Sequence, residues 1–273
     1  MHFQTPTLVS LTGAAWRAFR NRTQLFFLLA MLSGILSAFL YLPATQVVAE
    51  ILVILNSNEP ANAVADDLSA AISEGAPTLF VGHLLVTAVT TFLIVPWARA
   101  AAPGNLTPSA GGIAAFVRRG LRSFLHMIAA NGLTILLALV GLPLAAALTA
   151  SFGGLGNAVM MTAIVLMIWA AFAFTSLAHL AIAAEARDRK DTILTAWSRG
   201  RFFLMPITAS LALMFLLAFV ADLIIAPILL AVLPESMGDM FSMAFSGMIL
   251  FAASALHVAA LYIVPDFRDL RPS

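Results

Sequence analysis

Six apolar stretches lie between four short clusters that hold all fourteen Lys and Arg side chains of this chain. A membrane-spanning helix needs ~20 apolar residues, because each residue adds ~1.5 Å toward ~30 Å of hydrocarbon. The stretches lack the period-two alternation of barrel strands, so they predict transmembrane helices. We expect an all-α polytopic membrane protein with spans over residues 24–43, 78–98, 124–148, 158–184, 205–233 and 240–264.

The placement of the cationic clusters predicts the orientation of the chain. The clusters precede the first stretch, separate the second from the third and the fourth from the fifth, and follow the sixth. The other connections, over residues 57–77, 151–157 and 234–239, contain no Lys or Arg. Because short loops rich in Lys and Arg stay cytoplasmic, we expect both termini inside and an uncleaved first span. The single Lys among the cations and the frequent Ala indicate a GC-rich bacterium, and we expect the protein in a bacterial inner membrane.

Similar segments before and after the spans predict an internal repeat. Residues 15–20, 115–119 and 196–201 each place an aromatic residue before Arg, and residues 94–99, 182–187 and 263–268 each end in Arg. The distance from Phe116 to Arg187 equals the distance from Trp197 to Arg268. We predict three repeat units of about residues 5–100, 107–188 and 191–270 within one membrane domain. Each unit is a two-span hairpin, so the repeats are parallel.

A cytoplasmic-side amphipathic helix is predicted ahead of each hairpin. In the first, Leu8, Leu11, Ala15 and Phe19 share one face at helical spacing. Such a helix lies in the headgroup plane and is attracted to anionic lipid. The alternative is that these residues are the cytoplasmic ends of the spans and carry only orienting charge. The residues predicted to contact lipid or a partner are Trp16, Arg17, Arg20, Phe116, Arg118, Arg119, Trp197, Arg199 and Arg201.

This layout resembles the YciC-type six-span inner-membrane proteins and the membrane domain attached to some glycerophosphodiester phosphodiesterases. The resemblance covers most of the chain and rests on the basic, aromatic residues 16–22 and 197–201 and on a polar first outer loop. Such families tend to show a Val-x-Pro-Gly turn late in the third span, where this chain has Val-Gly-Leu-Pro at residues 140–143. The resemblance implies a membrane location and no particular activity.

Asp222 is the one acidic residue deep within a predicted span. An ionised carboxylate at the bilayer centre costs ~2.5–3.5 kcal/mol on insertion scales, so it faces protein or water, or is protonated. His83 is the titratable partner in the outer half of the spans, and an Asp222–His83 pair would relay protons or bind a cation. The alternative is that Pro227 ends the helix early, which places Asp222 near the outer interface.

The remaining chemistry points away from an enzyme. The chain has no Cys and no catalytic or phosphate-binding motif. His126, His179 and His257 lie in the cytoplasmic thirds of their spans without the helical spacing or the carboxylate of a metal site. We therefore interpret them as interfacial hydrogen-bonding residues and predict no metal and no cofactor.

We expect a non-catalytic integral membrane protein that organises lipid or docks a partner at the cytoplasmic face. The expected partners are the bilayer with its anionic lipid, another membrane protein or a second copy of the chain, and no nucleic acid. The alternative is a small-solute or ion transporter or channel that uses Asp222.

Overall fold

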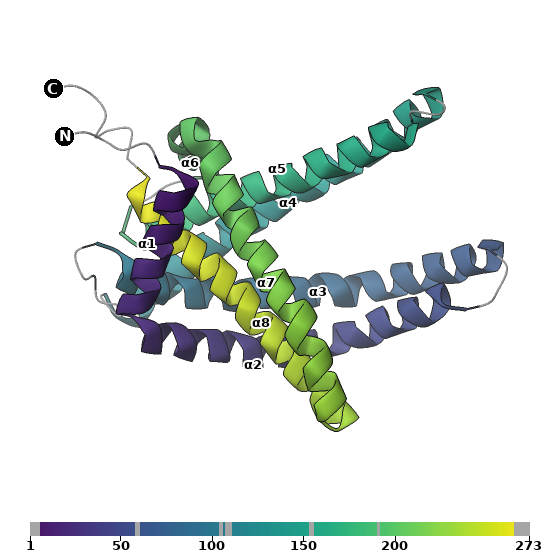
Figure 1. The fold of residues 1–273 in the computed structure, drawn as a ribbon, viewed down its shortest axis with the longest axis horizontal. Coiled ribbons are helices and arrows are strands. Elements are labelled where there is room, and N and C mark those ends of the chain that lie inside the picture. The colour runs from purple at the N-terminus through teal and green to yellow at the C-terminus, as the bar shows by residue number, and fades with distance from the viewer. Residues whose placement is uncertain are drawn as a thin grey trace. The chain divides into compact units, whose positions relative to one another are not determined.

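The computed structural model describes residues 6–57, 61–103, 106, 111–152, 156–189 and 192–264. Within these ranges the chain is helical and has no strand, which confirms the all-α prediction. In this described part of the chain, six helices are long and apolar enough to cross a membrane, as predicted. Figure 1 shows them as α2 (Thr23–Leu55), α3 (Ala61–Ala101), α4 (Gly112–Phe152), α5 (Gly156–Glu185), α7 (Leu204–Val232) and α8 (Glu235–Ala260).

The long helices extend beyond the predicted spans. The first span was expected to end at residue 43, yet α2 continues to Leu55. Pro43, Pro143 and Pro227 all lie inside helices, so none of them ends its helix. A proline removes one backbone hydrogen bond, whereas ending the helix in an apolar environment leaves several backbone groups without partners. The expectation that Pro227 ends the helix early is therefore wrong, whereas the depth of Asp222 in the membrane stays a prediction.

Shorter helical segments precede or follow the spans. They are α1 (Leu8–Asn21), α6 (Ile193–Gly200) and the 3-10 helices η2 (Arg201–Phe203) and η3 (Leu261–Ile263). Thr7 caps α1 by accepting a hydrogen bond from the Ser10 backbone N–H at 3.2 Å, while Ser10 Oγ accepts one from the Thr7 backbone N–H. Arg22, with φ −140° and ψ 34°, separates α1 from α2. Thr192 caps α6, which η2 separates from α7.

The separate helix predicted ahead of the third span is wrong. Residues 112–123 are the first turns of α4 itself, which runs without a break from Gly112 to Phe152. Gly111 and Gly112 adopt φ values of 87° and 69°, and this left-handed backbone sets where the helix begins. No proline lies between this start and Pro143, so nothing separates the basic residues from the span.

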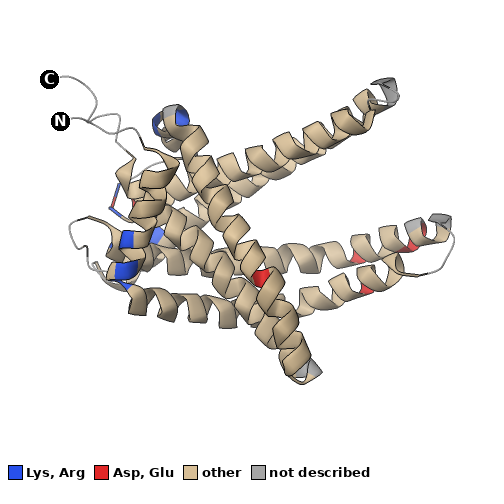
Figure 2. Cartoon of the chain, in the orientation of Figure 1, with Lys and Arg blue, Asp and Glu red and all other residues tan. Residues whose placement is uncertain are grey.

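The chain divides into two compact units. Unit 1 comprises Met1–Phe26, Thr91–Ala218 and Ala252–Ser273, and unit 2 comprises Phe27–Thr90 and Phe219–Phe251. All fourteen Lys and Arg residues belong to the sequence of unit 1, and unit 2 contains none. Accordingly, the charged residues that Figure 2 shows on α2 and α3 near their connection are all acidic.

Small residues and one tryptophan form the core of unit 1. The α4–α5 pair is visible as an antiparallel hairpin in Figure 1. Trp97 is fully buried, its Nε1 donates a hydrogen bond to the Ala255 carbonyl oxygen at 2.7 Å, and Phe26 packs edge-on against its ring. Ala is the most frequent buried residue of α5, and its small side chain lets neighbouring helices approach closely.

In unit 2, α2 and α8 cross at two glycines. A side chain on Gly34 would collide with the Ala244 carbonyl oxygen, and a Cβ atom on Gly247 would lie 2.7 Å from Ser37 Cβ. Only glycine allows this backbone approach. The crossing therefore fixes where α2 and α8 meet.

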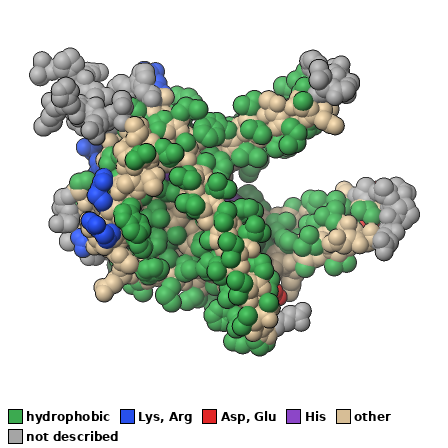
Figure 3. Space-filling model, in the orientation of Figure 1, with side chains coloured by type: hydrophobic (Ala, Val, Ile, Leu, Met, Phe, Trp, Pro, Cys, Tyr) green, Lys and Arg blue, Asp and Glu red, His purple; other side chains and the backbone are tan. Residues whose placement is uncertain are grey.

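Large apolar side chains cover the outer surface of the spans. In α4, Leu136 and Leu139 are exposed, and so are Met161 and Leu166 in α5. Hydrophobic side chains cover the visible faces of the long helices in Figure 3. Exposed apolar surface of this extent is unfavourable in water and suits a bilayer.

Candidate functional site

Asp188 joins two arginines from different helices. Its Oδ2 accepts a hydrogen bond from Arg99 Nη1 at 3.0 Å, and its Oδ1 accepts one from Arg119 Nε at 2.7 Å. Arg99 lies in the last turn of α3 and Arg119 in the first turns of α4. Both arginines are buried, whereas the Asp188 side chain is half exposed. One carboxylate therefore ties the ends of two spans to the connection that follows α5.

Asp188 holds this position with a left-handed backbone. Its φ is 62°, the conformation that helix ends usually assign to glycine. The Asp188 N–H donates to the Glu185 carbonyl oxygen at 3.0 Å, and the Arg189 N–H donates to the Ala184 carbonyl oxygen at 3.0 Å. These two bonds define a Schellman motif with Asp in the glycine position. A non-glycine residue there costs roughly 1 kcal/mol, and the two ion pairs offset that strain.

The charge environment keeps Asp188 ionised. Desolvation by burial raises the pKa of this carboxyl group, but hydrogen bonds from Arg119 and Arg99 and the charges of both arginines lower it by more. The net result is a pKa below the ordinary value of 3.8. Arg122 and Glu185 form a longer ion pair beside it, at 3.6 Å.

A closed ring of hydrogen bonds joins the ends of α3, α5 and η3. Arg99 Nη1 donates to the Ala186 carbonyl oxygen at 2.6 Å, and Arg187 Nη2 donates to the Tyr262 carbonyl oxygen at 3.3 Å. The Tyr262 hydroxyl donates to the Ala98 carbonyl oxygen at 2.6 Å and so completes the ring. The Arg187 guanidinium also lies 4.2 Å from the centroid of the Tyr262 ring, a cation–π contact.

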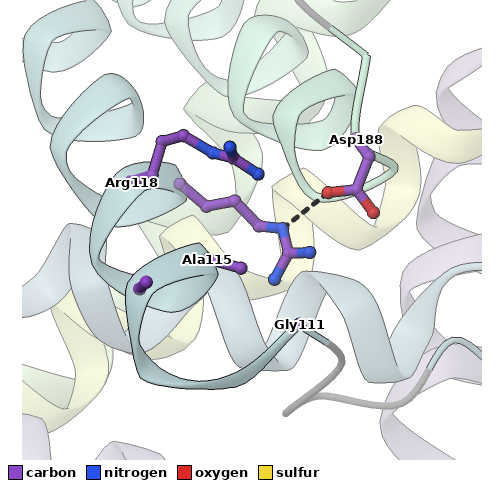
Figure 4. A pocket seen from close by; sticks show the side chains of 6 residues that line it. Gly111, Ala115, Arg118 and Asp188 are labelled. Carbon is purple, nitrogen blue, oxygen red and sulfur yellow. Dashed lines mark hydrogen bonds and ion pairs between the residues drawn. The ribbon is translucent and has the colours of Figure 1, made fainter.

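A shallow pocket of about 550 Å³ lies beside Asp188, lined by Gly111, Ala114, Ala115, Arg118, Arg119 and Asp188. Figure 4 shows Arg118 and Asp188 at this pocket, with the dashed line joining Asp188 to Arg119. Arg118 is exposed and makes no ion pair or hydrogen bond with any residue that the structure describes. The pocket thus presents an unpaired guanidinium beside one that a carboxylate holds in place.

The other residues predicted to contact lipid or a partner occupy varied positions. Trp16 is 61% exposed and Trp197 is 44% exposed, while Phe116 packs against Phe92 with ring centroids 5.8 Å apart. The exposed arginines are Arg17, Arg20 and Arg201, and Arg199 is half-buried. Whether any of these residues contacts lipid stays a prediction.

Two of the histidines meet inside unit 1. His179 Nδ1 and His257 Nδ1 lie 3.0 Å apart, both rings are fully buried, and His257 Nε2 lies 2.9 Å from the Ile207 carbonyl oxygen. His179 belongs to α5 and His257 to α8, so sequence spacing gave no sign of the pair. Among the described residues, no group of three metal-ligating side chains is assembled that could hold a metal ion.

Asp222 lies half-buried in α7 and has a polar partner on α8. Its Oδ1 accepts a hydrogen bond from Ser246 Oγ at 2.7 Å. Ser246 and His83 both line a cavity of about 750 Å³ in unit 2. The hydrogen-bond partner observed for Asp222 is Ser246. The Asp222–His83 pair stays a prediction.

Sequence reasoning missed Asp188, Arg99 and the histidine pair. Asp188 is one charge among several in a basic connection, and its partners lie far away in the sequence. No family model, curated protein or solved structure matches this chain. The fold and the site therefore define a class, an all-helical multi-pass membrane protein with an arginine cluster held by one aspartate.

Proposed function

We propose that this protein is a non-catalytic inner-membrane protein that binds the phosphate headgroup of anionic lipid at its cytoplasmic face. The observation that carries the proposal is the pocket in which Arg118 lies unpaired beside Arg119. Guanidinium groups bind phosphate oxygens with two parallel hydrogen bonds, so an arginine pair at a membrane surface favours anionic headgroups.

The charge balance at the pocket favours an anion. Asp188 is the one carboxylate that lines it, and Arg99 and Arg119 already share that carboxylate. The charge of Arg118 is therefore left without compensation among the described residues. A phosphate group would supply it, at a cost in desolvation that the open pocket keeps small.

The exposed tryptophans on α1 and α6 support a surface role. Trp residues concentrate where hydrocarbon meets headgroups, and Trp16 and Trp197 are both exposed on short helices next to arginines. We propose that α1 and α6 are amphipathic helices that lie in the headgroup plane. The first turns of α4, which carry Phe116 and Arg118, take the corresponding place in the second unit.

The proposal includes three parallel repeat units in a bacterial inner membrane with both termini cytoplasmic. The ring formed by Arg99, Arg187 and Tyr262 supports the repeat, because it joins the closing ends of the three proposed units. The resemblance to YciC-type proteins and to phosphodiesterase membrane domains agrees with this layout. Partner docking or self-association at the same face remains part of the proposal.

Lipid retention tests the proposed function. Wild-type protein and its variants are purified in mild detergent, incubated with phosphatidylglycerol or phosphatidylcholine, and analysed by native mass spectrometry. We expect Arg118→Gln to weaken phosphatidylglycerol binding about tenfold, since a charge-assisted hydrogen bond contributes ~1.5–3 kcal/mol. Arg22→Gln, which changes an exposed arginine outside both the pocket and the predicted contact residues, should bind as wild type does. Equal retention by Arg118→Gln and wild type would contradict the proposal.

A second candidate is a small-solute or ion transporter that uses Asp222. The observation that favours it is the hydrogen bond from Ser246, a residue that also lines the unit 2 cavity. In this case Asp222→Asn should abolish ion or proton flux in proteoliposomes while leaving lipid retention unchanged. Flux that is absent from wild-type proteoliposomes as well would remove this candidate.

A further inference from the structure

The unit 2 cavity has the features of a ligand site. Its volume of about 750 Å³ falls within the ~300–1,000 Å³ range of small-molecule pockets. Residues of α2, α3, α7 and α8 line it, and most of the lining is apolar. Ser37 and Gly247, which approach each other at the α2–α8 crossing, are both part of the lining.

Ser37 is the unusual polar group in this wall. It is 4% exposed, and its Oγ has no hydrogen-bond partner among the described residues. A buried hydroxyl group without a partner costs about 1–3 kcal/mol, and a polar ligand in the cavity would relieve that cost. Ser246 lines the same cavity and donates its own hydrogen to Asp222, so its oxygen lone pairs remain available as acceptors.

The cavity lining contains one carboxylate and no Lys or Arg, and its other titratable side chains are those of His83 and Tyr41. Asp239 lines the cavity, is exposed and has no ion pair with any residue that the structure describes, and Asp222 lies directly behind Ser246. No Lys or Arg occurs anywhere in the sequence of unit 2, so no protein cation compensates these carboxylates within the unit. The Tyr41 side chain, also in the lining, adds an aromatic ring whose face attracts cations.

We propose that this cavity binds a lipophilic organic cation. The apolar lining takes the hydrocarbon part of the ligand, Asp239 compensates its charge, and Ser37 and Tyr41 lie in the same wall. A neutral lipid chain would leave the carboxylate of Asp239 uncompensated, and an anionic amphiphile would be repelled by it. The inference concerns a separate site in unit 2 and does not depend on lipid binding at Arg118.

Tetraphenylphosphonium and tetraphenylborate give the sharpest test, because the two ions have nearly the same shape and opposite charge. Binding is measured by isothermal titration calorimetry on full-length protein in phosphatidylcholine nanodiscs, with the signal of empty nanodiscs subtracted. We expect saturable binding of tetraphenylphosphonium and none of tetraphenylborate. Equal binding of both ions, or no binding of the cation, overturns the proposal.

Two cavity variants and one control locate the site. Asp239→Asn should weaken tetraphenylphosphonium binding roughly tenfold, since one nearby charge in a partly dry site contributes on the order of 1–2 kcal/mol. Ala49→Trp, which fills part of the cavity, should abolish binding without changing its charge. Asp67→Asn, the same change on an exposed residue outside the lining, should bind as wild type does.

The same experiments distinguish an organic cation from a bilayer lipid as the occupant of the cavity. If Ala49→Trp reduces binding and Asp239→Asn does not, the cavity is not selective for charge and the proposal fails. Phospholipid that stays bound in native mass spectra and is not displaced by tetraphenylphosphonium overturns it as well. A thermal unfolding midpoint close to that of wild type shows that each variant is folded, and the comparison of the two ions on wild-type protein needs no variant.

Discussion

The Nδ1 atoms of His179 and His257 lie 3.0 Å apart in the buried interior of unit 1. The carbonyl oxygen of Ile207 can only accept a hydrogen bond, so His257 Nε2 carries a hydrogen and donates a hydrogen bond to that oxygen. In a neutral His257 ring, Nδ1 then accepts, and His179 Nδ1 donates. His179 Nε2 is left as a lone-pair acceptor without a partner among the described residues. The two rings thus depend on each other for their tautomers.

The two rings should therefore contribute to stability as a coupled pair, so that removal of either ring alone already loses their shared hydrogen bond. His257→Leu leaves His179 Nδ1 without an acceptor and should lower the free energy of unfolding by about 2 kcal/mol. The double variant His179→Leu/His257→Leu should lose less than the sum of the two single variants. Unfolding in detergent measures these losses, with His83→Leu as an exposed control. Strictly additive losses would show that the rings are not coupled.

Asp188 should respond differently to glycine and alanine. Both substitutions remove the ion pairs with Arg99 and Arg119, and we expect a loss of about 2 kcal/mol from the uncompensated buried arginines. Glycine also removes the strain of a φ of 62°, whereas alanine keeps it. Asp188→Gly should therefore be more stable than Asp188→Ala by roughly 1 kcal/mol. Equal stabilities of the two variants would argue against backbone strain at this position.

The pH dependence of stability follows from the lowered pKa of Asp188. Because the folded pKa lies below the ordinary value of 3.8, the unfolded chain takes up the proton first as the pH falls. The stability contributed by this carboxylate is fully present above the ordinary pKa and is lost as the pH falls through the folded pKa. The difference between wild type and Asp188→Asn should stay constant above about pH 5 and shrink below about pH 4. A difference that grows toward low pH would contradict this.

The α2–α8 crossing should not tolerate a side chain. Gly247→Ala places a Cβ atom 2.7 Å from Ser37 Cβ and should destabilise the protein by about 1–3 kcal/mol. Gly132→Ala makes the same change in α4, where a Cβ atom meets nothing within 4 Å. This control should be neutral or stabilising, since alanine favours a helix interior by roughly 0.5–1 kcal/mol over glycine. The thermal unfolding midpoint should fall for Gly247→Ala and should stay unchanged or rise for Gly132→Ala. Similar shifts for the two variants would refute the packing argument.

The spans were predictable from the sequence because length and apolarity are local properties. The start of α4 was not, because residues 112–123 were expected to form a separate helix and instead continue into the span without a break. Partners such as Asp188 and Arg99, or His179 and His257, come together only through tertiary packing. No local spacing indicated them. The unpaired Arg118 was predicted as a contact residue from its cluster, while the pocket beside it was not.

The central claim is that the arginine-rich connections and the acidic 57–77 segment lie on opposite sides of one membrane. The chain has no cysteine, so single substitutions report accessibility without background labelling. Ser69→Cys and Ser198→Cys change matched, exposed residues, one in the acidic segment and one on α6. A membrane-impermeant maleimide added to intact spheroplasts should label the cysteine at position 69 at once and the cysteine at position 198 only after permeabilisation. Labelling of both positions from the same side would contradict the account.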